Sequence, residues 1–171
     1  MRRAIITGVI LILNLVLQST LLQGIQIRGI VPNTAIIIIV SFSLFRGSGE
    51  GAVIGLCAGL LQDIFFGSGI GYYGLLGMAA GYFCGMAHRD FYRENYFLPI
   101  LLCAAATLLY ESTIYLTGFF FSGNLNFLYY FINLILPETV YTALFSIIVY
   151  RILFGINDSL ERKERHKRRL F

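Results

Sequence analysis

The sequence predicts an all-α integral membrane protein of about six transmembrane helices, with both chain ends in the cytoplasm. Three observations support this prediction: 57% of the 171 residues are hydrophobic, only 13% are charged, and the charges gather in short clusters. An ordinary soluble domain carries about 25% charged residues. A water-soluble core cannot hide so much apolar surface, whereas a bilayer accepts it.

The expected spans lie between the charge clusters. A span needs roughly 20 mostly apolar residues to cross a hydrocarbon layer about 30 Å thick. Helices are expected because unpaired backbone groups are costly in lipid, and because Ile36–Val40 is apolar without the alternation of a barrel strand. The six expected helices, with ends defined to about ±2–4 residues, are Ala4–Leu22, Ile30–Phe45, Gly51–Phe66, Ile70–Ala87, Phe97–Phe119 and Phe127–Ile152.

The basic residues set the orientation. With the N-terminus inside, every Lys and Arg except Arg28 falls on the cytoplasmic side, as the positive-inside rule requires. Residues 1–156 are therefore expected to form a single six-helix transmembrane domain, and residues 157–171 a basic cytoplasmic tail. The tail acts either as a topology anchor or as a segment attracted to anionic lipid.

Small residues recur at every fourth position through the third expected span. The series comprises Gly47, Gly51, Gly55 and Gly59, then Asp63, Gly67 and Gly71. Such a stripe lets membrane helices approach closely, because lipid gives them no hydrophobic reason to associate. Gly77, Gly81 and Gly85 repeat the spacing in the fourth span, so packing between these two helices and docking of a partner helix both remain open. Docking predicts that Gly55→Leu or Gly59→Leu weakens copurification with the partner.

Polar residues inside the apolar spans are the other candidates for function. The buried polar or cavity candidates are Asn14, Gln18, Gln62, Asp63, Glu111 and Glu138. A charge at mid-span costs about 2.5–3.5 kcal/mol on insertion scales, so the three carboxyl groups are expected to turn inward, to form hydrogen bonds or to stay protonated. They form either a buried polar cluster, with Arg28 or Asn133 as partner, or a contact for a small ligand or another protein.

The sixth span is expected to bend at Pro137. Proline has no backbone N–H, which leaves the carbonyl of Asn133 without its usual partner. A bend at this position would help to shape a cavity beside Glu138.

The sequence contains no convincing catalytic or nucleotide-binding motif. G-x-S-x-G, Walker and H-E-x-x-H motifs are absent, and Gly69–Gly74 matches G-x-G-x-x-G but joins two expected spans. We therefore expect no enzyme, and no metal, cofactor or nucleic-acid partner. An intramembrane enzyme that uses Asp63 or Glu138 as acid or base is a further alternative.

Several of these residues together resemble the MreD family of rod shape-determining proteins. The resemblance lies in Pro32-Asn33 before the second span, in the glycine series and in the segment Gly59–Gly71, with Glu111 and Pro137 as weaker matches. Chain length and the six-span layout agree with it. Asn33 departs from the acidic residue that is usual at its position in that family.

The resemblance implies a noncatalytic, multi-pass protein of the bacterial inner membrane. Its partners would be the single-helix scaffold MreC and, with it, the glycan polymerase RodA, a penicillin-binding transpeptidase and, indirectly, the actin-like MreB. It would help to organise lateral peptidoglycan synthesis and cell shape.

The MreD family is also similar in fold to the substrate-binding S components of energy-coupling-factor transporters. This similarity implies an S-component-like bundle with a cavity near Asp63 and Glu138. The alternative function is accordingly a substrate-binding S component of a vitamin-type transporter.

Overall fold

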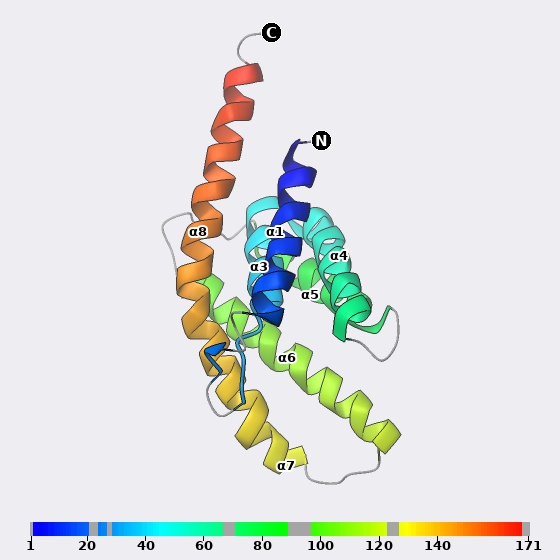
Figure 1. The fold of residues 1–171 in the computed structure, drawn as a ribbon. Helices are drawn as coiled ribbons and strands as arrows, with labels where there is room; N and C mark the ends of the chain where they lie inside the picture. Colours follow the sequence, from blue (N-terminus) through cyan, green and yellow to red (C-terminus); the bar gives the residue numbers. More distant parts are fainter. Residues whose placement is uncertain are drawn as a thin grey trace.

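A computed structural model describes residues 2–20, 24–26, 29–66, 71–88, 97–122 and 127–168, and all its elements are helices (Figure 1). In chain order they are α1 (Arg2–Ser19), α3 (Thr34–Arg46), α4 (Ser48–Phe66), α5 (Tyr72–Met86), α6 (Phe97–Ser122), α7 (Phe127–Tyr130), the π-helix η1 (Phe131–Ile135) and α8 (Leu136–Arg168). The prediction of an all-α chain is confirmed for these residues. The six expected helices correspond in order to α1, α3, α4, α5, α6 and the uninterrupted run from α7 to α8.

Helix α3 is the centre of the bundle. It contacts α1, α4, α5, α6 and α8, and every residue from Thr34 to Phe45 is buried. This position explains the run Ile36–Val40, which is apolar on all sides because other helices surround it. The helix begins at Thr34, four residues later than expected, because the Asn33 side chain caps it by accepting a hydrogen bond from the Ile36 N–H.

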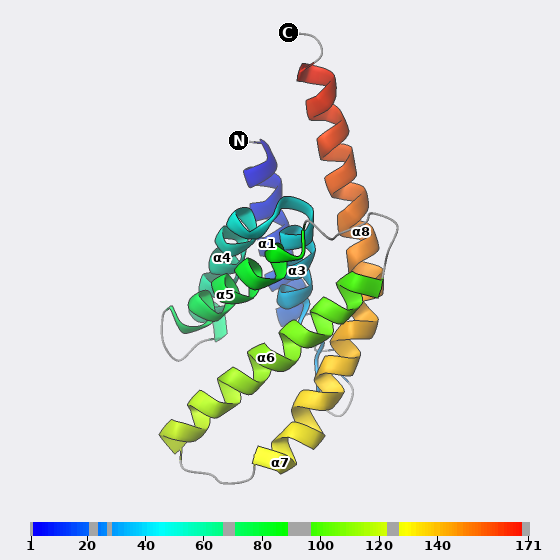
Figure 2. The same ribbon diagram turned by 180° about the vertical axis from the view of Figure 1, so that it is seen from behind.

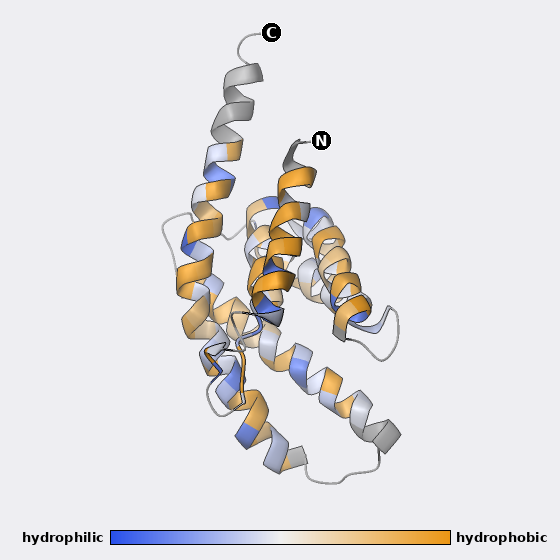
Figure 3. Ribbon diagram, viewed as in Figure 1, coloured by the Kyte–Doolittle hydropathy of each residue, from blue (hydrophilic) through white to orange (hydrophobic). Residues whose placement is uncertain are grey.

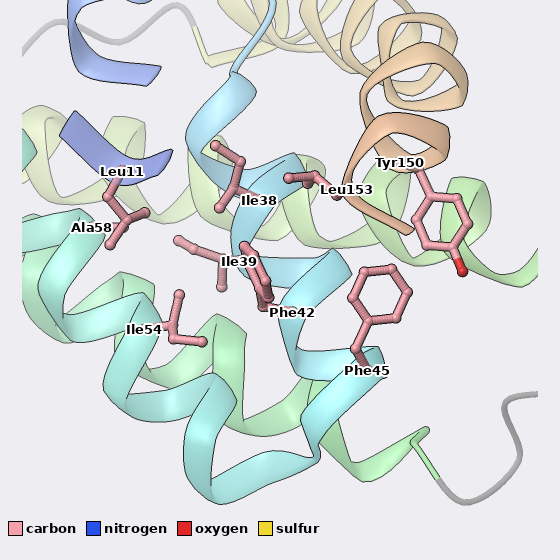
Figure 4. Close-up of a cluster of buried hydrophobic side chains, with 9 residues drawn as sticks. All are labelled: Leu11, Ile38, Ile39, Phe42, Phe45, Ile54, Ala58, Tyr150 and Leu153. Atoms are coloured by element: carbon pink, nitrogen blue, oxygen red, sulfur yellow. The ribbon is translucent and has the colours of Figure 1, made fainter. Parts of the chain in front are cut away.

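The largest core cluster joins α3 to three other helices. Figure 4 shows Ile38, Ile39 and Phe42 of α3 between side chains of α1, α4 and α8. At one end of the cluster the rings of Phe45 and Tyr150 lie 5.4 Å apart between centroids. The full set of buried residues is Leu11, Ile38, Ile39, Phe42, Phe45, Ile54, Ala58, Tyr150 and Leu153.

Helix α8 is the longest element described, and a π-helical turn precedes it. The Leu136 N–H donates to the Phe131 carbonyl, five residues back, so a π-helix stands directly before Pro137, where the sequence predicts a bend. With 33 residues, α8 is about 50 Å long. It continues through residue 157, where the sequence predicts the start of a separate tail, and residues 157–168 are helical.

The two chain ends lie at the same end of the molecule, and α8 extends beyond the other helices there (Figures 1 and 2). Two helical stretches of the described chain, Phe97–Gly118 and Leu128–Leu160, have the length and apolar character needed to cross a membrane. Two shorter apolar helices are Ala4–Ser19 and Thr34–Arg46.

Much of the outer surface is apolar. Figure 3 shows hydrophobic positions on the outside of α1 and α4 and along α8. Large side chains such as Ile5, Leu109 and Ile148 are more than half exposed. So many exposed large apolar side chains are uncommon on soluble monomers and suit contact with lipid.

Candidate functional site

Helices α4 and α5 pack against each other through a seam of glycines. Gly51 lies against Gly81, Gly55 against Gly77, Gly59 against Tyr73 and Gly74, and Gly85 against Ser48. A β-carbon added at Gly55 or Gly59 would lie less than 3.0 Å from backbone atoms of α5, a distance that real β-carbons do not show. Helix α5 therefore occupies the glycine face of α4. Of the two alternatives left open by the sequence, this geometry favours packing between the two helices.

The glycines at the two ends of the series allow unusual backbone conformations. Gly47, with φ of 90°, ends α3, and Gly71, with φ of 103°, precedes α5. Both angles lie in the left-handed region, which glycine adopts without steric cost. Gly67 lies outside the described residues.

Asp63 caps the next helix along the chain. Its Oδ2 accepts hydrogen bonds from the N–H groups of Gly71 and Gly74, and its Oδ1 accepts one from the N–H of Tyr73, each at 2.9 Å. The side chain is buried, at 3% relative exposure. A carboxylate at a helix N-terminus satisfies backbone donors that otherwise lack partners and interacts favourably with the helix dipole. This role explains an acid at the end of α4.

Asn33 links three helices in a buried polar cluster. Its side-chain nitrogen donates to Glu111 Oε1 of α6 at 3.0 Å, while its backbone N–H donates to the Thr142 hydroxyl of α8, also at 3.0 Å. The carboxyl groups of Glu111 on α6 and Glu138 on α8 lie next to each other. We refer to Asn33, Glu111, Glu138 and Thr142 as the polar cluster.

A polar cavity of about 290 Å³ adjoins this cluster. Gln62 borders it, and its Oε1 accepts a hydrogen bond from the Tyr110 hydroxyl at 3.0 Å. Four helices and the segment before α3 contribute to the lining, which consists of Gln18, Val31, Asn33, Gln62, Tyr73, Tyr110, Glu111 and Ile114. The cavity therefore brings together residues that are far apart in the sequence.

The remaining polar candidates lie at different places. Asn14 is buried in α1, at 9% relative exposure, and Gln18 lines the cavity one turn further along. Arg28 lies outside the described residues. Asn133 is not part of the polar cluster, because its side chain is exposed and donates to the Tyr129 carbonyl. The cluster instead uses Asn33, at the position where the sequence departs from the family pattern.

Arg46, which the positive-inside rule counts only as a topology signal, is a buried cation. Its side chain is 6% exposed, lies 3.5 Å from the Glu50 carboxylate and donates to the Thr7 hydroxyl at 3.1 Å. The guanidinium also sits 4.8 Å from the centroid of the Phe42 ring. No pattern in the sequence pairs Thr7 with Arg46, because the contact depends on how α1 packs against α3.

A family model described as rod shape-determining protein MreD matches residues 2–158. The chain belongs to the MreD family. MreD proteins are rod shape-determining proteins of membranes, and the two apolar, membrane-length stretches in α6 and in the run from α7 to α8 agree with that assignment. No curated protein and no solved structure matches the chain. The similarity to S components therefore remains an expectation from the sequence.

Proposed function

We propose that this MreD-family chain is a noncatalytic, multi-pass subunit of the bacterial cell-wall elongation machinery. The observation that carries the proposal is the family match over residues 2–158, nearly the whole chain. Its partners would be an MreC-like scaffold with a single membrane helix, a RodA-type glycan polymerase with its transpeptidase, and, indirectly, MreB. The chain would help these proteins to organise lateral peptidoglycan synthesis in the inner membrane.

The proposed arrangement in the membrane has six spans, with both chain ends in the cytoplasm. The positions of the chain ends at one end of the bundle support it (Figures 1 and 2). Helix α6, with 26 residues, is about 39 Å long and α8 is about 50 Å long, so each exceeds a hydrocarbon layer of about 30 Å. The part of α8 after residue 156 would then stand on the cytoplasmic side, where a basic segment is attracted to anionic lipid.

The packing of the bundle fixes how its helices are placed relative to one another. The glycine seam fixes α4 on α5, Asp63 caps α5, and the polar cluster joins α3, α6 and α8. We propose that these contacts hold the outer helices in the arrangement that the partner proteins recognise. A variant that separates α4 from α5 is then expected to lose partners together with stability.

Copurification from the native host tests the proposal. The tagged chain would be extracted from membranes with a mild detergent, and an unrelated multi-pass inner-membrane protein with the same tag and expression level would serve as control. We expect enrichment of the MreC-like scaffold and the RodA-type polymerase over the control, and rounded cells when the chain is depleted. Gly155→Ala should restore rod shape and Gly55→Leu should not. Rods of normal shape after depletion, or enrichment no greater than the control, would overturn the proposal.

A further inference from the structure

The polar cavity contains hydrogen-bonding groups that no part of the described chain satisfies. Within residues 2–20, 24–26, 29–66, 71–88, 97–122 and 127–168, the Gln18 amide and the Tyr73 hydroxyl have no hydrogen-bond partner, and the Gln62 amide nitrogen donates to none. These groups line the cavity from α1, α4 and α5, so they are available to hydrogen-bond with water or with a ligand there.

The charge of the cavity limits which ligands it accepts. Glu111 lines it and is the one acidic side chain among the described lining residues. Among the described lining residues there is no Lys, Arg or His. A cation is therefore favoured over an anion, because in a low-dielectric bundle an uncompensated anion beside a carboxylate is repelled strongly.

The aromatic lining favours an organic cation over a metal ion. The rings of Tyr73 and Tyr110 lie roughly parallel, 28° apart in plane, with centroids separated by 6.4 Å. An ammonium group near a tyrosine ring gains from the negative face of the ring, and its N–H groups find acceptors in the Tyr73 hydroxyl and the Gln18 amide oxygen. A volume of about 290 Å³ is close to the lower end of small-molecule sites, which begins at about 300 Å³.

We propose that this cavity is a binding site for a small organic ammonium ion, with Glu111 as its counter-charge and Gln18, Gln62 and Tyr73 as its neutral hydrogen-bonding partners. The proposal goes beyond the proposed function, since a subunit that only organises other proteins needs no ligand of its own. A cavity filled with water alone is the competing possibility, and it predicts no saturable response to any small molecule.

Thermal unfolding of the purified full-length chain tests the proposal. Cys84 and Cys103 are buried and free, so a fluorogenic maleimide reports unfolding when it reaches them, after Cys57, which is exposed, is replaced by alanine. The probes are propylammonium and cyclohexylammonium chloride, each compared with 1-propanol or cyclohexanol and with sodium chloride at equal ionic strength. We expect saturable stabilisation by at least one ammonium probe, with an apparent affinity at least tenfold tighter than that of its alcohol.

Removal of the charge should remove this preference. A single glutamine leaves one of the two neighbouring carboxyl groups, so the informative variant is Glu111→Gln/Glu138→Gln, in which both are replaced by neutral amides. We expect the affinities of the ammonium probe and its alcohol to fall within twofold of each other in this variant. Tyr73→Phe keeps the carboxyl pair and loses one unpaired hydroxyl, and we expect it to bind the ammonium about threefold to tenfold more weakly. Glu50→Gln, an exposed acid outside the cavity, should leave the preference unchanged.

Three outcomes would overturn the proposal. They are no saturable stabilisation by either ammonium probe, equal affinity for the ammonium and the alcohol in the wild-type protein, and an undiminished preference in the double variant. The first two need only the wild-type chain, so they decide the matter even if the double variant fails to fold. None depends on cell shape or copurification, so failure here leaves the proposed function standing.

Discussion

The glycine seam between α4 and α5 is sensitive to the addition of one methyl group at Gly55. A β-carbon at Gly55 would meet the carbonyl carbon and oxygen of Gly77, and both are backbone atoms. No side chain can rotate to make room, so the two helices must move apart. The same movement would loosen the neighbouring contacts at Gly51 and Gly59.

The expected loss can be estimated from the packing. Overpacking costs about 1–3 kcal/mol, and we take about 3 kcal/mol because backbone opposes backbone. Alanine inside a helix is about 1 kcal/mol more favourable than glycine, which offsets part of this cost. Gly55→Ala should therefore lower the free energy of unfolding by about 2 kcal/mol, which is a roughly 30-fold fall in the ratio of folded to unfolded chains.

A titration with SDS in mixed micelles, followed by maleimide labelling of Cys84 and Cys103, measures this change. The matched control is Gly155→Ala, because Gly155 is exposed inside α8 and a β-carbon there meets nothing within 4 Å. The control should be unchanged or up to about 1 kcal/mol more stable. If Gly55→Ala proved as stable as Gly155→Ala, the close approach of α4 and α5 would be refuted.

Two further substitutions test the polar contacts. Asp63→Asn offers one acceptor oxygen where three N–H groups now meet a carboxylate, so it should lose about 1–2 kcal/mol in the same titration, while Gly155→Ala, at an exposed position of α8, should lose none. Equal effects of the two would contradict the capping role. Asn33→Ala removes both the cap of α3 and the donor to Glu111, so it should lower the free energy of unfolding by about 2 kcal/mol or more. The same change at the exposed Asn133 should lower it by less than about 0.5 kcal/mol. A loss of stability at Asn33 no larger than that at Asn133 would contradict the stabilising role of Asn33 in the polar cluster.

The order and approximate extent of the helices could be predicted from the sequence because both follow from local composition. Charges and turn residues mark the ends of apolar runs, and lipid allows few structures other than helices. The start of α3 lies four residues after the expected one, within the stated range of about ±2–4 residues, because Asn33 caps the helix. The length of α8 was missed because charged residues end a membrane span without ending a helix.

The glycine spacing predicted a close helix contact, but it could not identify the neighbour. A small-residue stripe records the closeness of a contact, and it contains no information on which helix makes it. The matching spacing at Gly77 and Gly81 was the one available signal. The structure places these glycines directly opposite Gly55 and Gly51.

The polar contacts were the least predictable part of the site. Asp63 was expected either in a buried cluster of polar side chains or in a contact for a ligand or partner, yet its partners are backbone N–H groups of the next helix, which a list of polar side chains does not include. Asn33 and Glu111 meet across a large sequence separation, and Arg46 is held by Thr7 of α1. Such contacts depend on how whole helices are placed, which one sequence does not determine.

The arrangement of the spans in the membrane is the claim on which the proposed function depends most directly. Single cysteines would be introduced as Arg2→Cys, Gly24→Cys or Leu170→Cys in a chain whose three native cysteines are replaced, and spheroplasts would be treated with a membrane-impermeant maleimide. We predict that Gly24→Cys, between α1 and α3, is labelled in intact spheroplasts, and that Arg2→Cys and Leu170→Cys are labelled only after the membrane is permeabilised. Labelling of either terminal cysteine in intact spheroplasts as fast as Gly24→Cys would contradict a six-span bundle with both ends in the cytoplasm.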